Sequence, residues 1–398
     1  MARLEPFEPR PFLALAVSGG ADSLALALLA RDWARERGGS VLALVVDHGL
    51  RPESAAEAAT TVERLHSRGI PCRLLALSGL HPGPAMADRA REARYGALVH
   101  ACAEAGSLHL LLGHHRDDQA ETVMIRALGN SRSAGLAAMP ALREGAAVRL
   151  LRPLLDVPGA ELRTFLRADG IEWVEDPSNR NPLALRARLR MPQPPSADLA
   201  EASFAAGWAR AGAELQAARI VAERVSLHPE GFAVLSPGRI APDALGALLQ
   251  TIAGSPFPPP AAATETLAAA PGPATLAGVR LLPAGRFGPG WLVVREVAAM
   301  ETSVPATPGA IWDRRFRLLD EVSPGASLGP LGADGTRFRT RAGLPAAIIR
   351  TLPAIRCGIG LVAVPHLGYA RADCARARVL FCPPRPMAGA AFRPAASA

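Results

Sequence analysis

Phe12-Leu13-Ala14-Leu15-Ala16-Val17-Ser18-Gly19-Gly20-Ala21-Asp22-Ser23 is the stretch that decides the fold of the N-terminal half of this chain. Its first six residues are apolar and predict a buried strand, and helical spacing then runs from Ser23 to about Arg37. The two glycines allow a tight turn whose N–H groups no side chain covers. The positive end of the helix would face that turn, where open α/β sheets bind ligands. A phosphate site is therefore predicted, and the alternative is a plain glycine turn with a serine N-cap.

Asp22 is the informative residue of this turn. A carboxylate repels phosphate unless a cation lies between them, so we expect Mg²⁺ to bridge Asp22 and phosphate oxygens. The alternative is a helix N-cap aspartate. The 44 basic residues are all Arg, and the absence of Lys excludes a G-K-[ST] P-loop and any lysyl intermediate. The predicted phosphate-binding residues are Ser18, Gly19, Gly20, Ala21, Asp22 and Ser23.

Strand and helix patterns alternate through the first half of the chain. Apolar runs predict further strands at Val41–Asp47, Cys72–Leu77 and Leu108–Gly113, with helical spacing between and after them at Ser54–Arg68, Met86–Glu104 and Asp117–Leu128. The segments Val148–Arg152, Pro158–Ala168 and Ile171–Val174 continue the order strand, helix, strand. Such apolar strands with short connections predict an α/β fold with a doubly wound, mainly parallel sheet that is covered on both faces.

The composition changes after Arg190. A Pro-rich segment at 191–195 is typical of a linker, Asp198–Arg224 has a helical pattern, and the residues beyond 310 are irregular with short strands. We therefore expect three regions: an α/β domain at 1–192, a central, partly helical region at 193–298, and a small α+β region at 299–398. The last dozen residues are expected to be frayed.

The overall composition is strongly basic. A net charge of +8 and a pI of about 10.3 predict a polyanionic partner, with coding bias toward Arg as the alternative. Aromatic residues make up only 5%, which argues against a surface of base-stacking rings. No apolar run reaches the ~18 residues of a membrane span, and Met1–Arg10 has no signal-peptide pattern. Five scattered cysteines without C-x-x-C favour a reducing cytoplasm.

A second polar cluster, Gly113-His114-His115-Arg116-Asp117-Asp118-Gln119-Ala120-Glu121-Thr122, lies where the fourth strand ends and a helix begins. In helical register, Asp118, Glu121 and Thr122 share one face. Asp118 near His115 could hold a second Mg²⁺ or orient a nucleophile. Zinc is an alternative that lacks a third His or Cys at ligand spacing. A solvated charge cluster is the other alternative.

These motifs follow the order found in the tRNA(Ile)-lysidine synthetase family of PP-loop, or N-type, ATP pyrophosphatases, which the chain resembles over about residues 11–190. The motifs are S-G-G-A-D-S at 18–23, V-D-H-G-L-R at 46–51, A-R-x-x-R-Y at 90–95, H-H-x-x-D-Q-x-E-T at 114–122, G-L-A-A-M at 135–139, R-P-L-L at 152–155 and D-P-S-N at 176–179. The resemblance implies a PP-loop fold, ATP as a substrate and Mg²⁺ as a cofactor. Beyond Arg190 the resemblance is loose.

The resemblance also implies a reaction. The family transfers AMP from ATP to the C2 oxygen of the first anticodon cytidine of tRNA(Ile) with a CAU anticodon, and free L-lysine then displaces AMP. Carried over to this chain, the catalytic residues would be Asp22, Arg91 and Asp118, with Mg²⁺ on Asp22 and Asp118. His115 and Glu121 are candidates for handling the lysine amine.

Two departures from the family pattern concern the tRNA contacts. Arg186 and Arg190 match an R-N-x-x-R run, but Ala187 replaces its Asn and Arg188 is an extra basic residue. The three arginines are candidates for tRNA phosphates, and the alternative is a solvated basic edge. The loop at 129–136 lacks the R-G-S-G pattern of the family. Whether arginines of this loop contact the tRNA is therefore an open question.

Two other functions compete with lysine ligation. A PP-loop tRNA thiolase would need sulfur-handling cysteines or an iron–sulfur cluster, and Cys72 and Cys102 are not at cluster spacing. A non-catalytic, nucleotide-dependent RNA-binding protein would not need both Asp22 and Asp118. The sequence leaves open whether the protein forms a homodimer.

Overall fold

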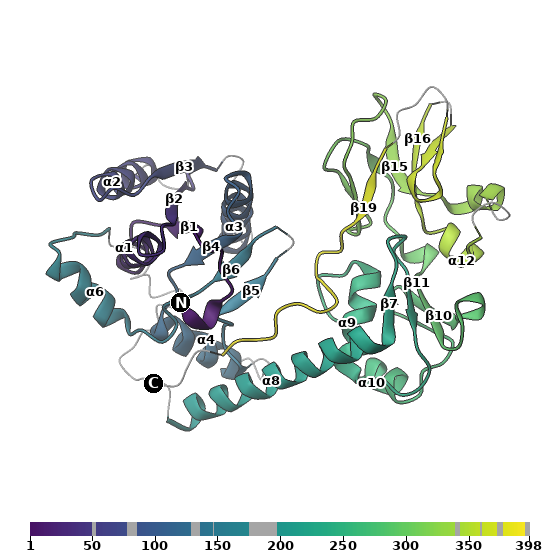
Figure 1. The fold of residues 1–398 in the computed structure, drawn as a ribbon, viewed down its shortest axis with the longest axis horizontal. Coiled ribbons are helices and arrows are strands. Elements are labelled where there is room, and N and C mark those ends of the chain that lie inside the picture. Colours follow the sequence, from purple (N-terminus) through teal and green to yellow (C-terminus); the bar gives the residue numbers. More distant parts are fainter. Residues whose placement is uncertain are drawn as a thin grey trace. The chain divides into compact units, whose positions relative to one another are not determined.

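A computed structural model describes residues 1–49, 53–77, 86–128, 136–145, 147–174, 197–338, 343–358, 360–371 and 377–394. These residues form two compact units, shown with their elements labelled in Figure 1. The first unit comprises 1–212 together with 390–398, and the second comprises 213–389. The helix α8 (Ala197–Arg224) contributes residues to both units. No described helix has the length and hydropathy needed to cross a membrane.

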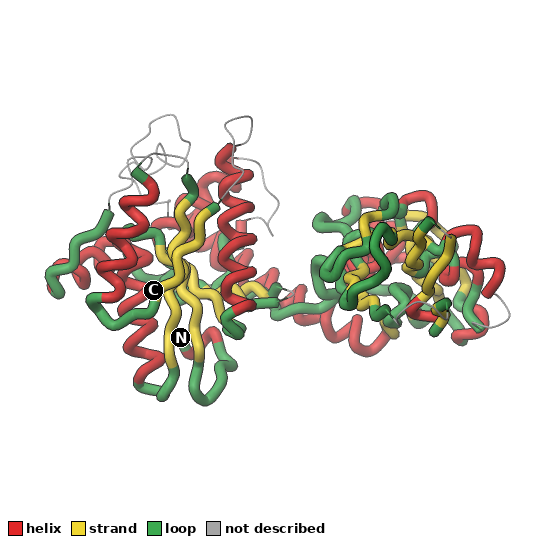
Figure 2. The backbone as a smooth tube through the Cα atoms, turned by 90° about the horizontal axis from the view of Figure 1, so that it is seen from above, coloured by secondary structure: helices red, strands yellow, loops and turns green. Residues whose placement is uncertain are grey.

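The first unit is built on a six-stranded sheet. Its strands are β1 (Phe12–Val17), β2 (Ser40–Asp47), β3 (Cys72–Ala76), β4 (His109–Leu112), β5 (Leu142–Glu144) and β6 (Arg149–Leu151). The strand order is β3-β2-β1-β4-β6-β5, and every neighbouring pair is parallel except β5 with β6. Helices flank this sheet on both sides in Figure 2. The predicted doubly wound, mainly parallel sheet is confirmed.

The helices of this unit cover both faces of the sheet because successive strand residues point to opposite faces. They are α1 (Ala21–Arg35), α2 (Ser54–His66), α3 (Met86–Glu104), α4 (Arg116–Leu128) and α6 (Gly159–Ala168), preceded by the 3-10 turn η1 (Ala2–Leu4). Leu13 and Leu15 belong to one hydrophobic core with residues of α1 and α6. Ala14, between them, belongs to a second core with residues of α3. Two fully buried cores therefore sandwich β1.

The expected strand at Ile171–Val174 is wrong. These residues have no strand structure, and Val174 instead donates its N–H to the carbonyl oxygen of Gly19 at 2.9 Å. The edge of the sheet beyond β6 is already occupied by β5, which pairs with β6 antiparallel. The segment therefore lies beside the glycine turn.

The expectation of a frayed C-terminus is also wrong for residues up to Pro394. Phe392 is buried, and the guanidinium of Arg210 lies 4.7 Å from its ring centroid. Ala141 donates its N–H to the carbonyl oxygen of Arg393 at 2.9 Å. Burial of an aromatic ring together with this backbone hydrogen bond holds the end of the chain on the first unit.

The described residues of the second unit form three antiparallel sheets. The first, in the order β7-β8-β11-β10-β9, comprises β7 (Val225–Leu227), β8 (Ala233–Leu235), β9 (Ala274–Leu276), β10 (Val279–Pro283) and β11 (Trp291–Arg295), with α9 (Pro242–Ala253) and α10 (Ala261–Ala269). The second comprises β12 (Val304–Pro305), β15 (Ser327–Pro330), β16 (Pro353–Cys357), β17 (Gly360–Val364) and β18 (Tyr369–Ala370). The third comprises β13 (Ile311–Trp312), β14 (Phe316–Leu318) and β19 (Val379–Phe381). The short helices are α12 (Ala346–Ile349), η3 (Gly285–Phe287), η4 (Val297–Ala299), η5 (Gly332–Phe338) and η6 (Pro365–Leu367).

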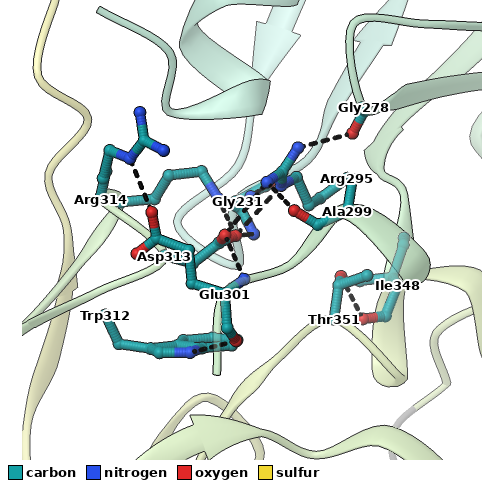
Figure 3. Close-up of polar contacts among 11 residues, drawn as sticks. Gly231, Gly278, Arg295, Ala299, Glu301, Trp312, Asp313, Arg314, Ile348 and Thr351 are labelled. Atoms are coloured by element: carbon teal, nitrogen blue, oxygen red, sulfur yellow. Dashed lines mark hydrogen bonds and ion pairs between the residues drawn. The ribbon is translucent and has the colours of Figure 1, made fainter. Parts of the chain in front are cut away.

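A buried ion-pair network joins separate segments of this unit, as Figure 3 shows. Asp313 is 2% exposed and accepts hydrogen bonds from the Nε atoms of Arg295 and Arg315, at 3.2 and 2.9 Å. It also accepts the N–H of Glu301 at 3.1 Å. The indole N–H of Trp312 donates to the carbonyl oxygen of Glu301 at 3.2 Å. The carboxylate of Asp313 therefore connects β11 with the residues that precede and follow β13.

Candidate active site

The two predicted motifs meet at one edge of the sheet because their strands are neighbours. Ala16 of β1 pairs with Leu112 of β4 in a parallel ladder, so the residues that follow each strand lie at the same edge. Gly113 permits their close approach, since a Cβ atom there would lie 3.2 Å from backbone atoms of Asp22 and Ser23. Gly113 is the first residue of the predicted second cluster, but the sequence indicated no role for it. Its position directly after a buried strand was the available signal.

The glycine turn is closed by its own serine. The Oγ atom of Ser23 accepts the N–H of Ser18 at 3.1 Å and donates to the carbonyl oxygen of Gly20 at 2.9 Å. Ser23 is 7% exposed. Its hydroxyl therefore shapes the turn, and the first N–H groups of α1, which have no intrahelical acceptor, are the donors left for a ligand.

Gly19 is required by both its backbone angle and its surroundings. Its φ is +82°, and a Cβ atom would lie 2.3 Å from Oγ1 of Thr61. Thr61 is 1% exposed and donates to the carbonyl oxygen of Glu57 at 2.8 Å, so its side chain is fixed. Thr61 is a second residue that sequence reasoning missed, because its contact with the turn is between elements far apart in the chain.

Three predicted residues converge beside this turn: Asp22, His115 and Asp118. The Nε2 atom of His115 lies 3.4 Å from Oδ2 of Asp22 and 3.7 Å from Oδ2 of Asp118. Asp118 also accepts the backbone N–H of His115 at 3.0 Å. The other oxygen of Asp22, Oδ1, is buried and has no hydrogen-bond partner. One histidine thus holds two carboxylates together.

The orientation of His115 follows from its two ring nitrogens. Its Nδ1 atom accepts the N–H of Asp117 at 3.2 Å, which leaves Nε2 to carry the proton toward Asp22 and Asp118. Burial lowers the pKa of His115, but the hydrogen bond to Asp22 and the charges of the nearby aspartates outweigh it, and the net pKa is raised above 6.5. Gly159 allows this packing, because a Cβ atom there would lie 3.0 Å from the imidazole.

The donor set fits a magnesium ion that shares its ligands with a nucleotide. Mg²⁺ is usually bound by one or two carboxylates together with substrate phosphates and water. The buried, unpartnered Oδ1 of Asp22 is such a carboxylate oxygen, next to a turn that presents N–H groups. Within the described residues, no group of three or more His, Cys, Asp and Glu side chains is placed to hold a metal. An ion at this edge would therefore depend on the phosphates for much of its coordination.

The remaining predicted residues lie on α3, on α4 or outside the described residues. Arg91 is exposed on α3, with its guanidinium 5.2 Å from the ring centroid of Tyr95. Glu121 is 8% exposed on α4, one helical turn after Asp118. Arg186, Arg188, Arg190 and residues 129–135 of the atypical loop lie outside the described residues.

Comparisons with known proteins show which family the chain resembles. A family model described as a PP-loop domain matches residues 2–194. The tRNA(Ile)-lysidine synthase of Ruegeria pomeroyi is 36% identical over 389 residues, which cover 91% of this chain and 90% of that protein. Those of Bradyrhizobium sp. strain BTAi1 and Bradyrhizobium diazoefficiens are 45% and 43% identical over 48% and 56% of this chain. These two alignments span only 53% and 62% of the relatives' own length.

Among solved structures, the U34-tRNA thiolase NcsA of Methanococcus maripaludis is similar with 20% identity and a TM-score of 0.39, over 46% of this chain and 65% of that one. So distant a likeness carries no functional argument. The match to the Ruegeria pomeroyi protein runs through both units, and the PP-loop match covers the turn and the carboxylate cluster. The chain belongs to the tRNA(Ile)-lysidine synthase family.

Proposed function

We propose that this protein ligates free L-lysine to C2 of the first anticodon cytidine of tRNA(Ile) with a CAU anticodon, with ATP cleaved to AMP and pyrophosphate. The observation that carries the proposal is the convergence of Asp22, His115 and Asp118 beside a lysine-free glycine turn. The choice of substrate is supported by the tRNA(Ile)-lysidine synthase of Ruegeria pomeroyi, because its alignment with this chain covers 90% of that protein's length.

The reaction has two steps. In the first, the C2 oxygen of cytidine attacks the α-phosphorus of ATP, the bond to the β-phosphate breaks, and pyrophosphate leaves. In the second, the ε-amine of lysine attacks C2, AMP leaves with the oxygen, and the amine loses a proton. The main-chain N–H groups at the start of α1 would hold the phosphates in line for the first step. Mg²⁺, when bound at Asp22 and Asp118, would neutralise phosphate charge.

We propose different tasks for the residues of the cluster. The Nδ1 lone pair of His115 already accepts an N–H, so His115 serves to fix the two carboxylates. Asp118, which is about one quarter exposed, is then the better acceptor for the lysine proton. Glu121 on the same face of α4 would bind the amine. Arg91, which stays charged, would stabilise the phosphate charge that develops during adenylation.

The rest of the chain would bind the tRNA. We propose that Arg186, Arg188 and Arg190 contact tRNA phosphates and that the regions 193–298 and 299–398 bind the body of the tRNA. The anticodon base is already single-stranded, so its entry into the site costs little unstacking. The proposed location is the cytoplasm, and a homodimer stays an open alternative.

The test combines the purified protein with ATP, Mg²⁺, radiolabelled lysine and a CAU tRNA(Ile) transcript. We expect lysine to enter the RNA and to fail to enter when the first anticodon base is changed to uridine. Asp22→Asn and Asp118→Asn should each lose at least 100-fold in rate, as expected when charge stabilisation is removed. Asp32→Asn, an exposed change on the same helix as Asp22, is the matched control and should be unaffected.

The competing functions predict other results. Pyrophosphate release that depends on added tRNA but not on lysine, with no lysine in the RNA, would favour a thiolase. ATP binding without any tRNA-dependent pyrophosphate release would favour a nucleotide-dependent RNA-binding protein. Either result would contradict the proposed ligation.

A further inference from the structure

The first unit contains a cavity of about 270 Å³ that the proposed reaction does not use. It is lined by α1, the end of α2 and the segment that follows α6, three helices that Figure 1 labels. Among the described residues that line it, none is a predicted site residue. Its volume is just below the range of about 300–1,000 Å³ that is typical of small-molecule sites. The cavity therefore suits a small metabolite.

Four aliphatic side chains line this cavity. Leu24 and Leu28 lie one turn apart on α1, Leu65 lies on α2, and Ile171 follows α6. The three leucines are at most 5% exposed and belong to one hydrophobic core, against which Ile171 packs. Side chains of this kind stabilise an apolar group of a ligand and offer nothing to a charged one.

Two side chains of opposite charge line the same cavity, Arg64 on α2 and Glu172 after α6. The Nη2 atom of Arg64 lies 3.8 Å from Oε2 of Glu172, which is an ion pair but is too long for a hydrogen bond. The Nη1 atom of Arg64 is buried and has no hydrogen-bond partner among the described residues. Buried N–H groups nearly always have an acceptor. Arg64 therefore lacks an oxygen that a ligand could provide.

The two charges together favour a zwitterion over a simple anion. A carboxylate that accepts hydrogen bonds from Nη1 of Arg64 would lie close to the carboxylate of Glu172, which repels it. An ammonium group on the same ligand removes this repulsion, because it can contact Glu172. An α-amino acid carries both charged groups on one carbon atom. If its side chain is aliphatic, it also matches the apolar lining of the cavity.

The three elements that line the cavity also hold the glycine turn. The helix α1 begins directly after Gly20. The helix α2 carries Thr61, one turn before Leu65, and a Cβ atom at Gly19 would lie 2.3 Å from Oγ1 of Thr61. The segment after α6 reaches Val174, whose N–H donates to the carbonyl oxygen of Gly19 at 2.9 Å. A ligand that contacts both α2 and this segment would therefore stabilise the packing around Gly19.

We propose that this cavity binds a free α-amino acid with an aliphatic side chain, which donates to Glu172 and accepts from Arg64, and that its binding strengthens the binding of ATP at the glycine turn. The site is separate from the one at which the substrate lysine reacts, and the inference goes beyond the proposed ligation. The coupling arises because the ligand needs α2 and the segment after α6 to be packed together, as Gly19 does. Coupling is reciprocal, so ATP should strengthen the binding of the amino acid by the same factor.

The first test is isothermal titration calorimetry of the full chain with L-leucine, without ATP or RNA. Leucine should bind at one site. Two analogues keep its aliphatic group but lack one charge each: 4-methylpentanoate has no ammonium group, and 3-methylbutylamine has no carboxylate. Each should bind at least about tenfold more weakly than leucine, because one charge-assisted contact is lost. No binding of leucine, or equal binding of 4-methylpentanoate, would overturn the proposed ligand class.

The second test changes the two charged residues. Arg64→Gln should weaken leucine binding at least about tenfold, and Glu172→Gln should lower the affinity for leucine to that for 4-methylpentanoate. The matched controls are Arg35→Gln on α1 and Glu161→Gln on α6, which remove the same charges from exposed positions. Unchanged ATP binding by Arg64→Gln in the absence of leucine shows that the variant is folded. Leucine binding that survives Arg64→Gln would overturn the site.

The third test measures the coupling to the glycine turn. Saturating leucine should lower the dissociation constant of Mg²⁺–ATP about fivefold in the wild type and should have no effect in Arg64→Gln. Equal ATP affinity with and without leucine would overturn the coupling.

Failure of this inference and failure of the proposed function give different results, since no measurement here uses RNA or the incorporation of lysine. A wild-type protein that incorporates no lysine but binds leucine through Arg64 would contradict the ligation and support the cavity site. A protein that incorporates lysine but does not bind leucine would overturn the cavity site alone.

Discussion

Replacement of Gly19 by Ala tests whether the glycine turn is held in place by the packing that the structure shows. Two costs should add. At φ +82°, a residue with a Cβ atom costs about 1–2 kcal/mol relative to glycine. The new Cβ atom would also lie 2.3 Å from Oγ1 of the buried Thr61, and overpacking of this kind costs about 1–3 kcal/mol. Together, the two costs should lower the free energy of unfolding of the first unit by about 2–5 kcal/mol.

Gly69 offers a matched control. Its φ is +69°, and a Cβ atom there would meet nothing within 4 Å, so Gly69→Ala carries only the backbone cost of about 1–2 kcal/mol. The assay is hydrogen exchange of the amides of β1, which reports the free energy of opening of the first unit, together with equilibrium binding of ATP. Gly19→Ala should lose more stability than Gly69→Ala and should also lose ATP affinity.

A double variant separates the two costs. Thr61→Ala in the Gly19→Ala background removes the clash but not the unfavourable φ, so it should recover the overpacking part of the loss. The reasoning would be refuted if Gly19→Ala lost no more stability than Gly69→Ala and bound ATP like the wild type. It would also be refuted if Thr61→Ala recovered nothing.

Three further predictions concern the two units separately. Asp313→Ala leaves two buried guanidinium groups without their carboxylate and should destabilise the second unit by about 3–5 kcal/mol in urea unfolding. Burial lowers the pKa of His109, and this effect outweighs the neighbouring Glu8 carboxylate, which raises the pKa. The unfolded chain therefore binds a proton at a higher pH than the folded chain, and stability should fall as the pH drops below about 6.5, more steeply in Glu8→Gln and less in His109→Gln. Burial raises the pKa of Cys102 to about 11, so at pH 8 its alkylation in the native protein should be at least ~100-fold slower than in urea.

Local sequence patterns were sufficient to predict most of the helices and strands of the first unit. The strand β1 has the bounds that its apolar run predicts, because six consecutive apolar residues between a charged segment and a glycine turn leave few alternatives. The meeting of Asp22 with Asp118 was expected only from the resemblance to a known family. Local patterns indicate that both residues follow strands, but they do not indicate that these strands are neighbours.

Long-range packing was the part that could not be predicted. Thr61 contacts the turn from another element, and nothing in its own segment marks it. The C-terminal tail is the clearest case, because a short segment rich in Ala and Pro gives no sign that the ring of Phe392 is buried or that the carbonyl oxygen of Arg393 accepts the N–H of Ala141. Tertiary contacts of this kind join elements that are far apart in the chain.

The most direct measurement of the central claim is a crystal structure with a non-hydrolysable ATP analogue and Mn²⁺ in place of Mg²⁺, with the ion located by anomalous scattering. The account predicts an anomalous peak within about 2–2.3 Å of a carboxylate oxygen of Asp22 and of the analogue's phosphates, with the main-chain N–H groups at the start of α1 donating to those phosphates. A triphosphate bound away from the glycine turn, with Asp22 in contact with neither the ion nor the nucleotide, would contradict it.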